Sequence, residues 1–212
     1  MFNFYVDVER ETHADTVKLF GETQRKRGKF MEKGKIIFLN GVSSSGKTTL
    51  ANVLREKLDK PYFLFGVDAF LANTLSKKID GLELYKQALS GFHHTIKLYS
   101  DMGYNVVVDH ILFRIPRGME EAVELLHDYP VLFVHVTCPI EELRRREKER
   151  GDRPIGNAEN QLSELMPQDN TYDITVNTYS NSTEECADKI VALLDYPEKF
   201  TAFKTLWSQR TE

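Results

Sequence analysis

Apolar-rich stretches recur along the chain from residue 35 onward, separated by polar turns and amphipathic segments. They predict strands at 36–39, 62–67, 104–108, 131–136 and 174–176. The first of them is a continuous apolar run, which is typical of a strand buried on both faces of a parallel sheet. Leucine at positions 50, 54 and 58 then predicts a helix over 48–58, because this spacing places the three side chains on one face.

Helical periodicity returns between the later strands. The longest helix is predicted over 82–101, where an apolar residue recurs every three or four positions. Further helices are predicted at 117–127, from Pro139 through Arg146, and after the capping box Ser182–Glu185. Strands that alternate with helices indicate an α/β fold, in which helices flank a mostly parallel central sheet to make three layers.

The two ends of the chain stand apart from this pattern. We expect residues 1–33 to be an N-terminal extension of strand, helix and basic tether, and residues 34–195 to be the main domain. In residues 196–212, aromatic and aliphatic side chains recur at near-helical spacing, which predicts a C-terminal helix docked on the core. A contact between copies of the chain in a homo-oligomer is the alternative role of this helix.

Composition and charge narrow the classes of partner. The chain has 212 residues, 41% hydrophobic and 28% charged, which is ordinary for a globular protein. A net charge of −4 argues against a nucleic-acid partner, because phosphate neutralisation needs a basic surface. The first residues lack the basic and apolar regions of a secretory signal, and no apolar run approaches the roughly 20 residues that span a bilayer. We therefore expect a cytoplasmic protein with no membrane partner.

A glycine-rich motif, Gly41-Val-Ser-Ser-Ser-Gly-Lys-Thr48, separates the first predicted strand from the first predicted helix. Its spacing fits G-x-x-x-x-G-K-S/T, whose backbone amides hold phosphate groups at the start of a helix. Lys47 can reach the outer phosphates of a nucleotide, and the Thr48 hydroxyl can ligate Mg²⁺. The residues predicted to hold the nucleotide are Gly41, Val42, Ser43, Ser44, Ser45, Gly46, Lys47, Thr48 and Thr49.

Acidic residues follow two of the predicted strands, at Asp68 and Asp109. Ligands bind at the carboxyl ends of parallel strands, so both side chains are candidates for the site. Asp68 is predicted to be the catalytic carboxylate that orients or deprotonates an acceptor hydroxyl; capping a helix near Ala69 is the alternative. Asp109 is predicted to bind Mg²⁺, with a turn at the strand end as the alternative. The chain lacks the N-K-x-D motif of GTPases and the L-S-G-G-Q motif of transporter ATPases.

A basic run at 144–150 leads into a segment punctuated by glycine and proline, and together they predict a lid near 144–160. Arginine suits such a lid because its planar guanidinium grips phosphate oxygens. Arg150 and Arg153 are predicted to act on the γ-phosphate, whereas a solvated helix face is the alternative. His110, beside Asp109, is expected to be a structural histidine.

Taken together, these residues resemble the chloramphenicol phosphotransferase-like family of P-loop kinases. The resemblance covers roughly residues 35–194. It rests on Ile37–Gly41, the serine-rich loop, Phe65–Asp68, the strand ending at Asp109, Arg150–Arg153 and the pattern from Tyr172 to Ala187. It implies a P-loop kinase fold, ATP, Mg²⁺ and phosphate transfer to a hydroxyl of a small molecule. It places the catalytic aspartate at Asp68 and the lid arginines at Arg150 and Arg153.

Three departures argue against chloramphenicol itself as the acceptor. The segment between Asp68 and Asp109 is shorter than in the chloramphenicol enzyme, His110 stands where that enzyme has a second acid, and neither end of the chain has a counterpart. We expect an ATP-dependent phosphotransferase for an antibiotic-like molecule or a related metabolite. A toxin-like kinase acting on a nucleotide-sugar or a nucleic-acid end, and a nucleotide-binding regulatory module, are the alternatives. Asp68 and the arginines favour an enzyme, since a binding module needs neither.

Overall fold

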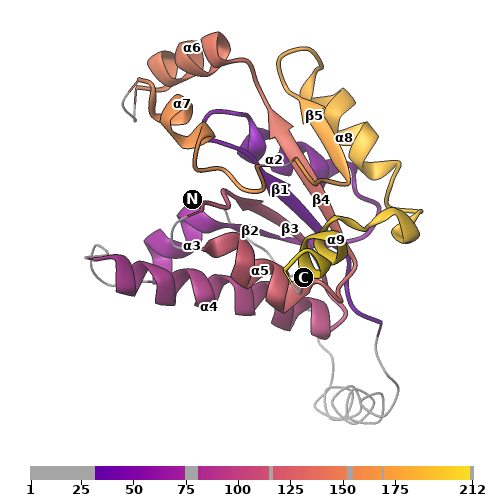
Figure 1. Cartoon of the computed structure of the whole chain (residues 1–212). Coiled ribbons are helices and arrows are strands. Elements are labelled where there is room, and N and C mark those ends of the chain that lie inside the picture. Colours follow the sequence, from indigo (N-terminus) through magenta and orange to yellow (C-terminus); the bar gives the residue numbers. More distant parts are fainter. Residues whose placement is uncertain (1–31, 75–80, 115–116, 152–154, 169, 211–212) are drawn as a thin grey trace, which may run out of the picture. The chain divides into compact units, whose positions relative to one another are not determined.

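The computed structural model of the chain describes residues 32–74, 81–114, 117–151, 155–168 and 170–210. These residues form a five-stranded sheet in the order β2-β3-β1-β4-β5, in which every neighbouring pair is parallel (Figure 1). The strands are β1 (Ile36–Asn40), β2 (Tyr62–Gly66), β3 (Asn105–His110), β4 (Val131–Thr137) and β5 (Ile174–Asn177). The predicted strand, helix and basic tether before residue 32 lie outside the described residues.

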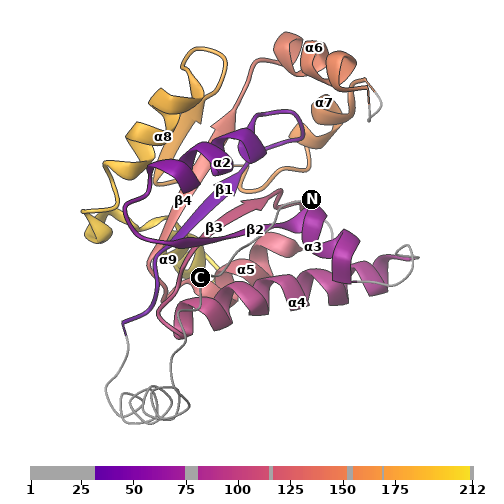
Figure 2. The same ribbon diagram turned by 180° about the vertical axis from the view of Figure 1, so that it is seen from behind.

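Helices cover both faces of the sheet, which makes three layers (Figures 1 and 2). The helices are α2 (Lys47–Lys57), α3 (Val67–Thr74), α4 (Leu82–Asp101), α5 (Gly118–Leu126), α6 (Ile140–Arg150), α7 (Asn157–Leu162), α8 (Thr183–Val191) and α9 (Ala202–Ser208), with a 3₁₀ turn at Pro197–Lys199. None of the helices within the described ranges has the length and apolar character that a membrane span requires. The predicted α/β fold with a parallel central sheet is confirmed.

The core follows from the alternation of side chains along β1. Ile36 and Phe38 point to the face covered by α4, α5 and α9, whereas Ile37 and Leu39 point to the face covered by α2 and α8. All five residues of β1 are buried, because β3 and β4 pair with its two edges and helices cover its two faces. This explains the continuous apolar run in the sequence.

Most element ends lie within one or two residues of those predicted, and one of these shifts concerns the site. Strand β2 ends at Gly66, one residue earlier than predicted, and α3 begins at Val67, two residues before Ala69. Asp68 therefore lies in the first turn of α3, and the alternative that it caps this helix is wrong. Helix α7 was not predicted from the sequence, which indicated only a loop beyond the basic run.

Helix α9 packs on the same face of the sheet as α5 (Figure 1). The Phe203 ring lies 4.9 Å from the Phe133 ring and 5.7 Å from the Phe38 ring, measured between centroids. The Asp173 carboxylate accepts hydrogen bonds from the amides of Thr201 and Ala202, at 2.7 and 2.9 Å, and from the amide of Phe133 at 2.8 Å. The start of α9 is thereby joined to β4.

Replacing Phe203 by alanine tests how much this packing contributes to stability. Phe203 is only 2% exposed, so its removal leaves a cavity among aromatic side chains. We expect Phe203→Ala to lower the free energy of unfolding by about 3–5 kcal/mol in denaturant titrations. Lys204→Ala, at an exposed position of the same helix, should change it by less than about 0.5 kcal/mol. A similar small change for Phe203→Ala would contradict a stabilising role for α9.

Candidate active site

The glycine-rich loop joins β1 to α2, and its path requires glycine at two positions. Gly46 has a φ of 93°, and Ser44 also has a positive φ, of 60°. A Cβ atom at Gly46 would stand 3.2 Å from the Thr178 side chain, and one at Gly41 would stand 2.3 Å from the carbonyl oxygen of Val136. Gly46 is therefore required mainly by its backbone conformation and Gly41 by a close backbone contact.

The loop offers hydrogen-bond donors of the kind that phosphate groups need. Helix α2 begins at Lys47, and its N-cap residue, Gly46, has no side chain that could satisfy the first helical amides. The Ser44 hydroxyl, on a residue that lines the cavity, is buried and lacks a hydrogen-bond partner within the described part of the chain. Such donors at the positive end of a helix suit an anionic ligand, and the phosphates of ATP fit this donor set.

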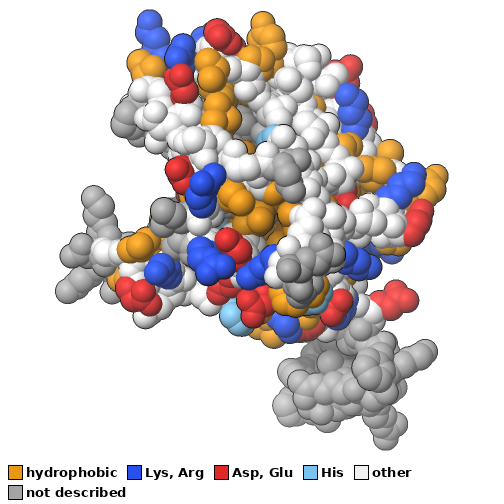
Figure 3. All heavy atoms as spheres, viewed as in Figure 1, with side chains coloured by type: hydrophobic (Ala, Val, Ile, Leu, Met, Phe, Trp, Pro, Cys, Tyr) orange, Lys and Arg blue, Asp and Glu red, His pale blue; other side chains and the backbone are white. Residues whose placement is uncertain are grey.

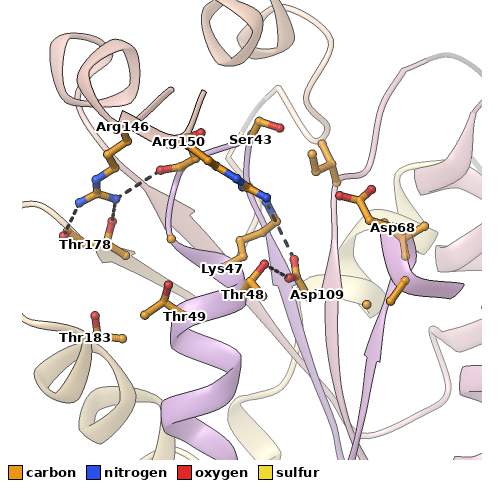
Figure 4. Close-up of a pocket in the computed structure, with 16 residues that line it drawn as sticks. Ser43, Lys47, Thr48, Thr49, Asp68, Asp109, Arg146, Arg150, Thr178 and Thr183 are labelled. Carbon is orange, nitrogen blue, oxygen red and sulfur yellow. Dashed lines mark hydrogen bonds and ion pairs between the residues drawn. The ribbon is translucent and has the colours of Figure 1, made fainter. Parts of the chain in front are cut away.

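The loop forms one wall of a cavity of about 530 Å³. The molecular surface is hollowed between α6–α7 and α3–α4 (Figure 3), and the cavity residues are drawn in Figure 4. Of the residues predicted to hold the nucleotide, those that line the cavity are Ser43, Ser44, Gly46, Lys47, Thr48 and Thr49. Gly41, Val42 and Ser45 are buried and support the loop from within.

Lys47 is held inside the loop. Its side chain is 7% exposed, and its Nζ atom donates a hydrogen bond to the carbonyl oxygen of Val42 at 3.0 Å. The same Nζ atom lies 4.0 Å from Oδ1 of Asp109. The ammonium group is thus fixed between the loop and the end of β3, beside the amides that face the cavity.

Thr48 and Asp109 form a pair at the edge of the sheet. The Thr48 hydroxyl donates to Oδ2 of Asp109 at 2.5 Å (Figure 4). The register of the sheet explains the contact, because Asp109 of β3 stands opposite Leu39 of β1, just before the loop. A hydroxyl and a carboxylate are oxygen donors of the kind that Mg²⁺ prefers.

Asp68 lies across the cavity from Thr48 and Asp109, on the first turn of α3 (Figure 4). A Cβ atom at Gly66, two residues before Asp68, would meet nothing within 4 Å, so the cavity wall is open beside Gly66. Burial and, to a smaller extent, the charge of Asp68 raise the pKa of Tyr85 on α4. The charge of Asp68 therefore acts on the Tyr85 phenol.

Two arginines of α6 complete the lining. Arg146 donates to the hydroxyl and the carbonyl oxygen of Thr178, both at 3.0 Å, and to the carbonyl oxygen of Ser44 at 3.3 Å. Arg150, one turn later, also lines the cavity. Arg153, the other predicted lid arginine, lies outside the described residues.

Three polar side chains that the sequence did not connect meet behind this site. Nδ1 of His93 is 3.0 Å from Oε2 of Glu121, and Nε2 of His93 is 3.2 Å from Nε2 of His110. Burial, followed by the nearby charges of His93 and Lys47, holds the pKa of His110 well below its usual range. His110 alternates with Asp109 along β3, so it points into the core beside Phe92 rather than toward the loop.

The sequence interpretation missed Thr178 and Thr183, which line the cavity, and assigned no contact to Arg146. A signal for Thr178 was present, because this residue directly follows β5 and so stands at the carboxyl end of a parallel strand. The same rule had selected Asp68 and Asp109. Arg146 stood within a basic run whose members the sequence alone did not distinguish.

The amino-acid sequence is similar to those of proteins named as phosphate-transferring enzymes. A model of the family described as chloramphenicol phosphotransferase-like protein matches residues 34–195. A protein of Mycobacterium tuberculosis strain H37Rv, provisionally named an O-phosphotransferase, is 28% identical over 186 residues, which cover 76% of this chain and 82% of that protein. An adenylyl-sulfate kinase of Clostridium acetobutylicum is 24% identical over 187 residues, which cover 81% of this chain and 88% of that protein.

Solved structures share the fold. An APS kinase of Mycobacterium tuberculosis, in complex with AMPPNP and APS, superposes with a TM-score of 0.62 at 20% identity and covers 77% of this chain and 98% of that one. A tunicamycin resistance protein of Deinococcus radiodurans superposes with a TM-score of 0.58 at 22% identity and covers 76% of this chain and 96% of that one. These likenesses confirm the predicted P-loop kinase fold.

Replacing Lys47 by alanine tests the loop. Lys47 lines the cavity, and its ammonium group contacts a loop carbonyl and approaches Asp109, so its charge stands beside the site. We expect Lys47→Ala to weaken ATP binding in titration calorimetry and to lower turnover by about 10²–10³-fold or more, with an unchanged circular dichroism spectrum. Lys57→Ala, on the same helix and paired with Asp188 at the surface, should leave both quantities unchanged. Normal ATP binding by a folded Lys47→Ala variant would contradict the assignment.

Proposed function

Because the chain belongs to the chloramphenicol phosphotransferase-like family and is an ATP-dependent P-loop kinase, we propose that it transfers the γ-phosphate of ATP to a hydroxyl group of a small molecule. The proposed acceptor is antibiotic-like or a related metabolite. The names of the two sequence relatives, an O-phosphotransferase and an adenylyl-sulfate kinase, support a small acceptor.

The observation that carries the proposal is the position of Asp68. It lines the same cavity as the phosphate-binding loop but stands on the opposite wall (Figure 4). A module that only binds nucleotide has no need of a carboxylate at this place. A kinase needs one, because an acceptor hydroxyl is a poor nucleophile until its proton is removed or directed.

In the proposed reaction the acceptor hydroxyl lies between Asp68 and the γ-phosphate. Its oxygen forms a bond to the γ-phosphorus while the bond from that phosphorus to the β-phosphate oxygen breaks. The hydroxyl proton passes to the Asp68 carboxylate, and ADP leaves. The loop amides hold the β-phosphate, and Lys47 and Arg150 stabilise the charge on the transferred group.

Thr48 and Asp109 are the residues proposed to hold Mg²⁺. Their oxygen atoms are 2.5 Å apart at the mouth of the loop, so both can face one ion. Within the described ranges, no group of three or more histidine, cysteine or acidic side chains is arranged as a metal site. The Thr48 hydroxyl and the Asp109 carboxylate would supply oxygen ligands of the kind that Mg²⁺ prefers. When bound, Mg²⁺ neutralises charge on the β- and γ-phosphates.

The acceptor is identified first, by testing hydroxylated antibiotics, nucleosides, nucleotide-sugars and sugars for label transfer from γ-labelled ATP. A kinase shows ATP consumption that rises when the acceptor is added. A regulatory nucleotide-binding module would show no such rise with any small molecule, and its ATP hydrolysis would respond to a protein partner.

The proposal is then tested by replacing Asp68 with asparagine. Asparagine is nearly isosteric, and loss of a negative charge from the first turn of a helix costs only about 0.3–1 kcal/mol, so the fold and ATP binding should be retained. We expect Asp68→Asn to lower phosphorylation of the acceptor by about 10²–10⁴-fold, the usual contribution of a general base. The measurement is kcat with the acceptor identified in the screen.

Asp128→Asn is a matched control, because the Asp128 side chain is 76% exposed on a surface away from the cavity lining. Its kcat should equal that of the wild type. If Asp68→Asn phosphorylates the acceptor at nearly the wild-type rate, Asp68 is not the catalytic carboxylate, and Asp109 becomes the candidate.

A further inference from the structure

One side chain of the short helix α7 is hydrogen-bonded to the phosphate-binding loop. The Oε1 atom of Gln161 accepts a hydrogen bond from the backbone amide of Ser43 at 2.7 Å. Ser43 is 2% exposed and lies in the middle of the loop. A loop amide is thereby engaged by a residue 118 positions later in the chain.

The other end of α7 is held by a buried carboxylate of α6. Oε2 of Glu147 accepts from the amide of Gly156 at 2.7 Å, and Oε1 accepts from the amide of Ala158 at 2.6 Å. Glu147 is 1% exposed. Gly156, the N-cap of α7, has no side chain to satisfy these amides, so Glu147 supplies the acceptors. A helix of this length is marginal alone, and its position depends on such contacts.

Helix α6 returns to the loop and closes a ring of contacts. Arg146, next to Glu147, donates to the carbonyl oxygen of Ser44. A small apolar cluster fills the inside of the ring and consists of Val42, Leu143, Ala158 and Leu165. Hydrogen bonds therefore join the loop to α7, α7 to α6, and α6 back to the loop. Apolar side chains of the same segments pack together.

We propose that Gln161 is a positioning residue that fixes α6, and with it Arg150, relative to the phosphate-binding loop. This inference rests on the proposed function, since Arg150 matters only if a phosphoryl group is transferred. Arg150 lies in the last turn of α6, and stabilising a transition state requires its guanidinium to be held in place. Without the hydrogen bond between Gln161 and Ser43, only apolar packing around Val42 and Ala158 joins α7 to the loop, and such packing does not fix a direction.

The first test replaces Gln161 by methionine, which keeps the length and helix propensity of the side chain but removes the acceptor oxygen. Hydrogen exchange is measured on the ligand-free protein, over peptides that cover residues 155–165. We expect exchange of α7 amides to be at least about tenfold faster in Gln161→Met than in the wild type, since loss of the contact allows local opening. Asn160→Ala, at the adjacent exposed position of α7, is the matched control and should exchange as the wild type does.

The second test separates kcat from KM. We expect Gln161→Met to lower kcat by about 10–100-fold, the size of effect that misplaced catalytic groups produce, while KM for ATP changes by less than about threefold. Gln161→Glu keeps an oxygen that accepts from Ser43, so it should restore kcat to within about threefold of the wild type. Its added negative charge beside the phosphates should instead raise KM for ATP.

Two results would overturn the inference. Unchanged exchange of α7 in Gln161→Met would show that the contact does not hold the helix. Faster exchange with a wild-type kcat would show that the contact is structural and does not position a reacting group. Absence of phosphate transfer by the wild-type protein would instead refute the proposed function and, with it, the positioning role, while the exchange experiment still reports on the contact itself.

Discussion

Burial of β1 at the centre of the sheet is the constraint on which the cavity depends. Its five residues are buried, and strands pair with both of its edges. The register then places Asp109 opposite Leu39 on one side and opposite Gly66 on the other. Three neighbouring strands therefore end at the same level, and the loop, the Thr48–Asp109 pair and Asp68 meet there.

Features that depend on local periodicity or on a short motif could be predicted from the sequence. The apolar run at 36–39 and the leucine spacing after it predicted a parallel sheet with a helix behind the loop, and both are present. The capping box at Ser182 and Glu185 is also formed. Asp68 and Asp109 could be selected as site candidates because strand ends are visible in the pattern and parallel strands end on one edge.

Contacts between residues distant in the sequence could not be predicted. The pairing of His93 with Glu121 and His110 brings together three elements, and none of these residues has a diagnostic spacing. Glu147 stands in a charged run that is typical of a solvated helix face, yet it is buried because two backbone amides of the following segment need acceptors. Helix α7 escaped prediction for a related reason, since tertiary contacts rather than a periodic apolar face define it.

The side chain of Arg146, which lines the cavity, is already fixed in the ligand-free protein. The Arg146 guanidinium is occupied by Thr178, Ser44 and Glu142, so a side chain with many rotamers is confined to one of them by the fold. Confining an arginine typically costs on the order of 2 kcal/mol in conformational entropy. Here that loss falls on the folding equilibrium, so a ligand that enters does not incur it again. The affinity of a ligand that contacts Arg146 is therefore not lowered by the entropy cost of ordering this one side chain.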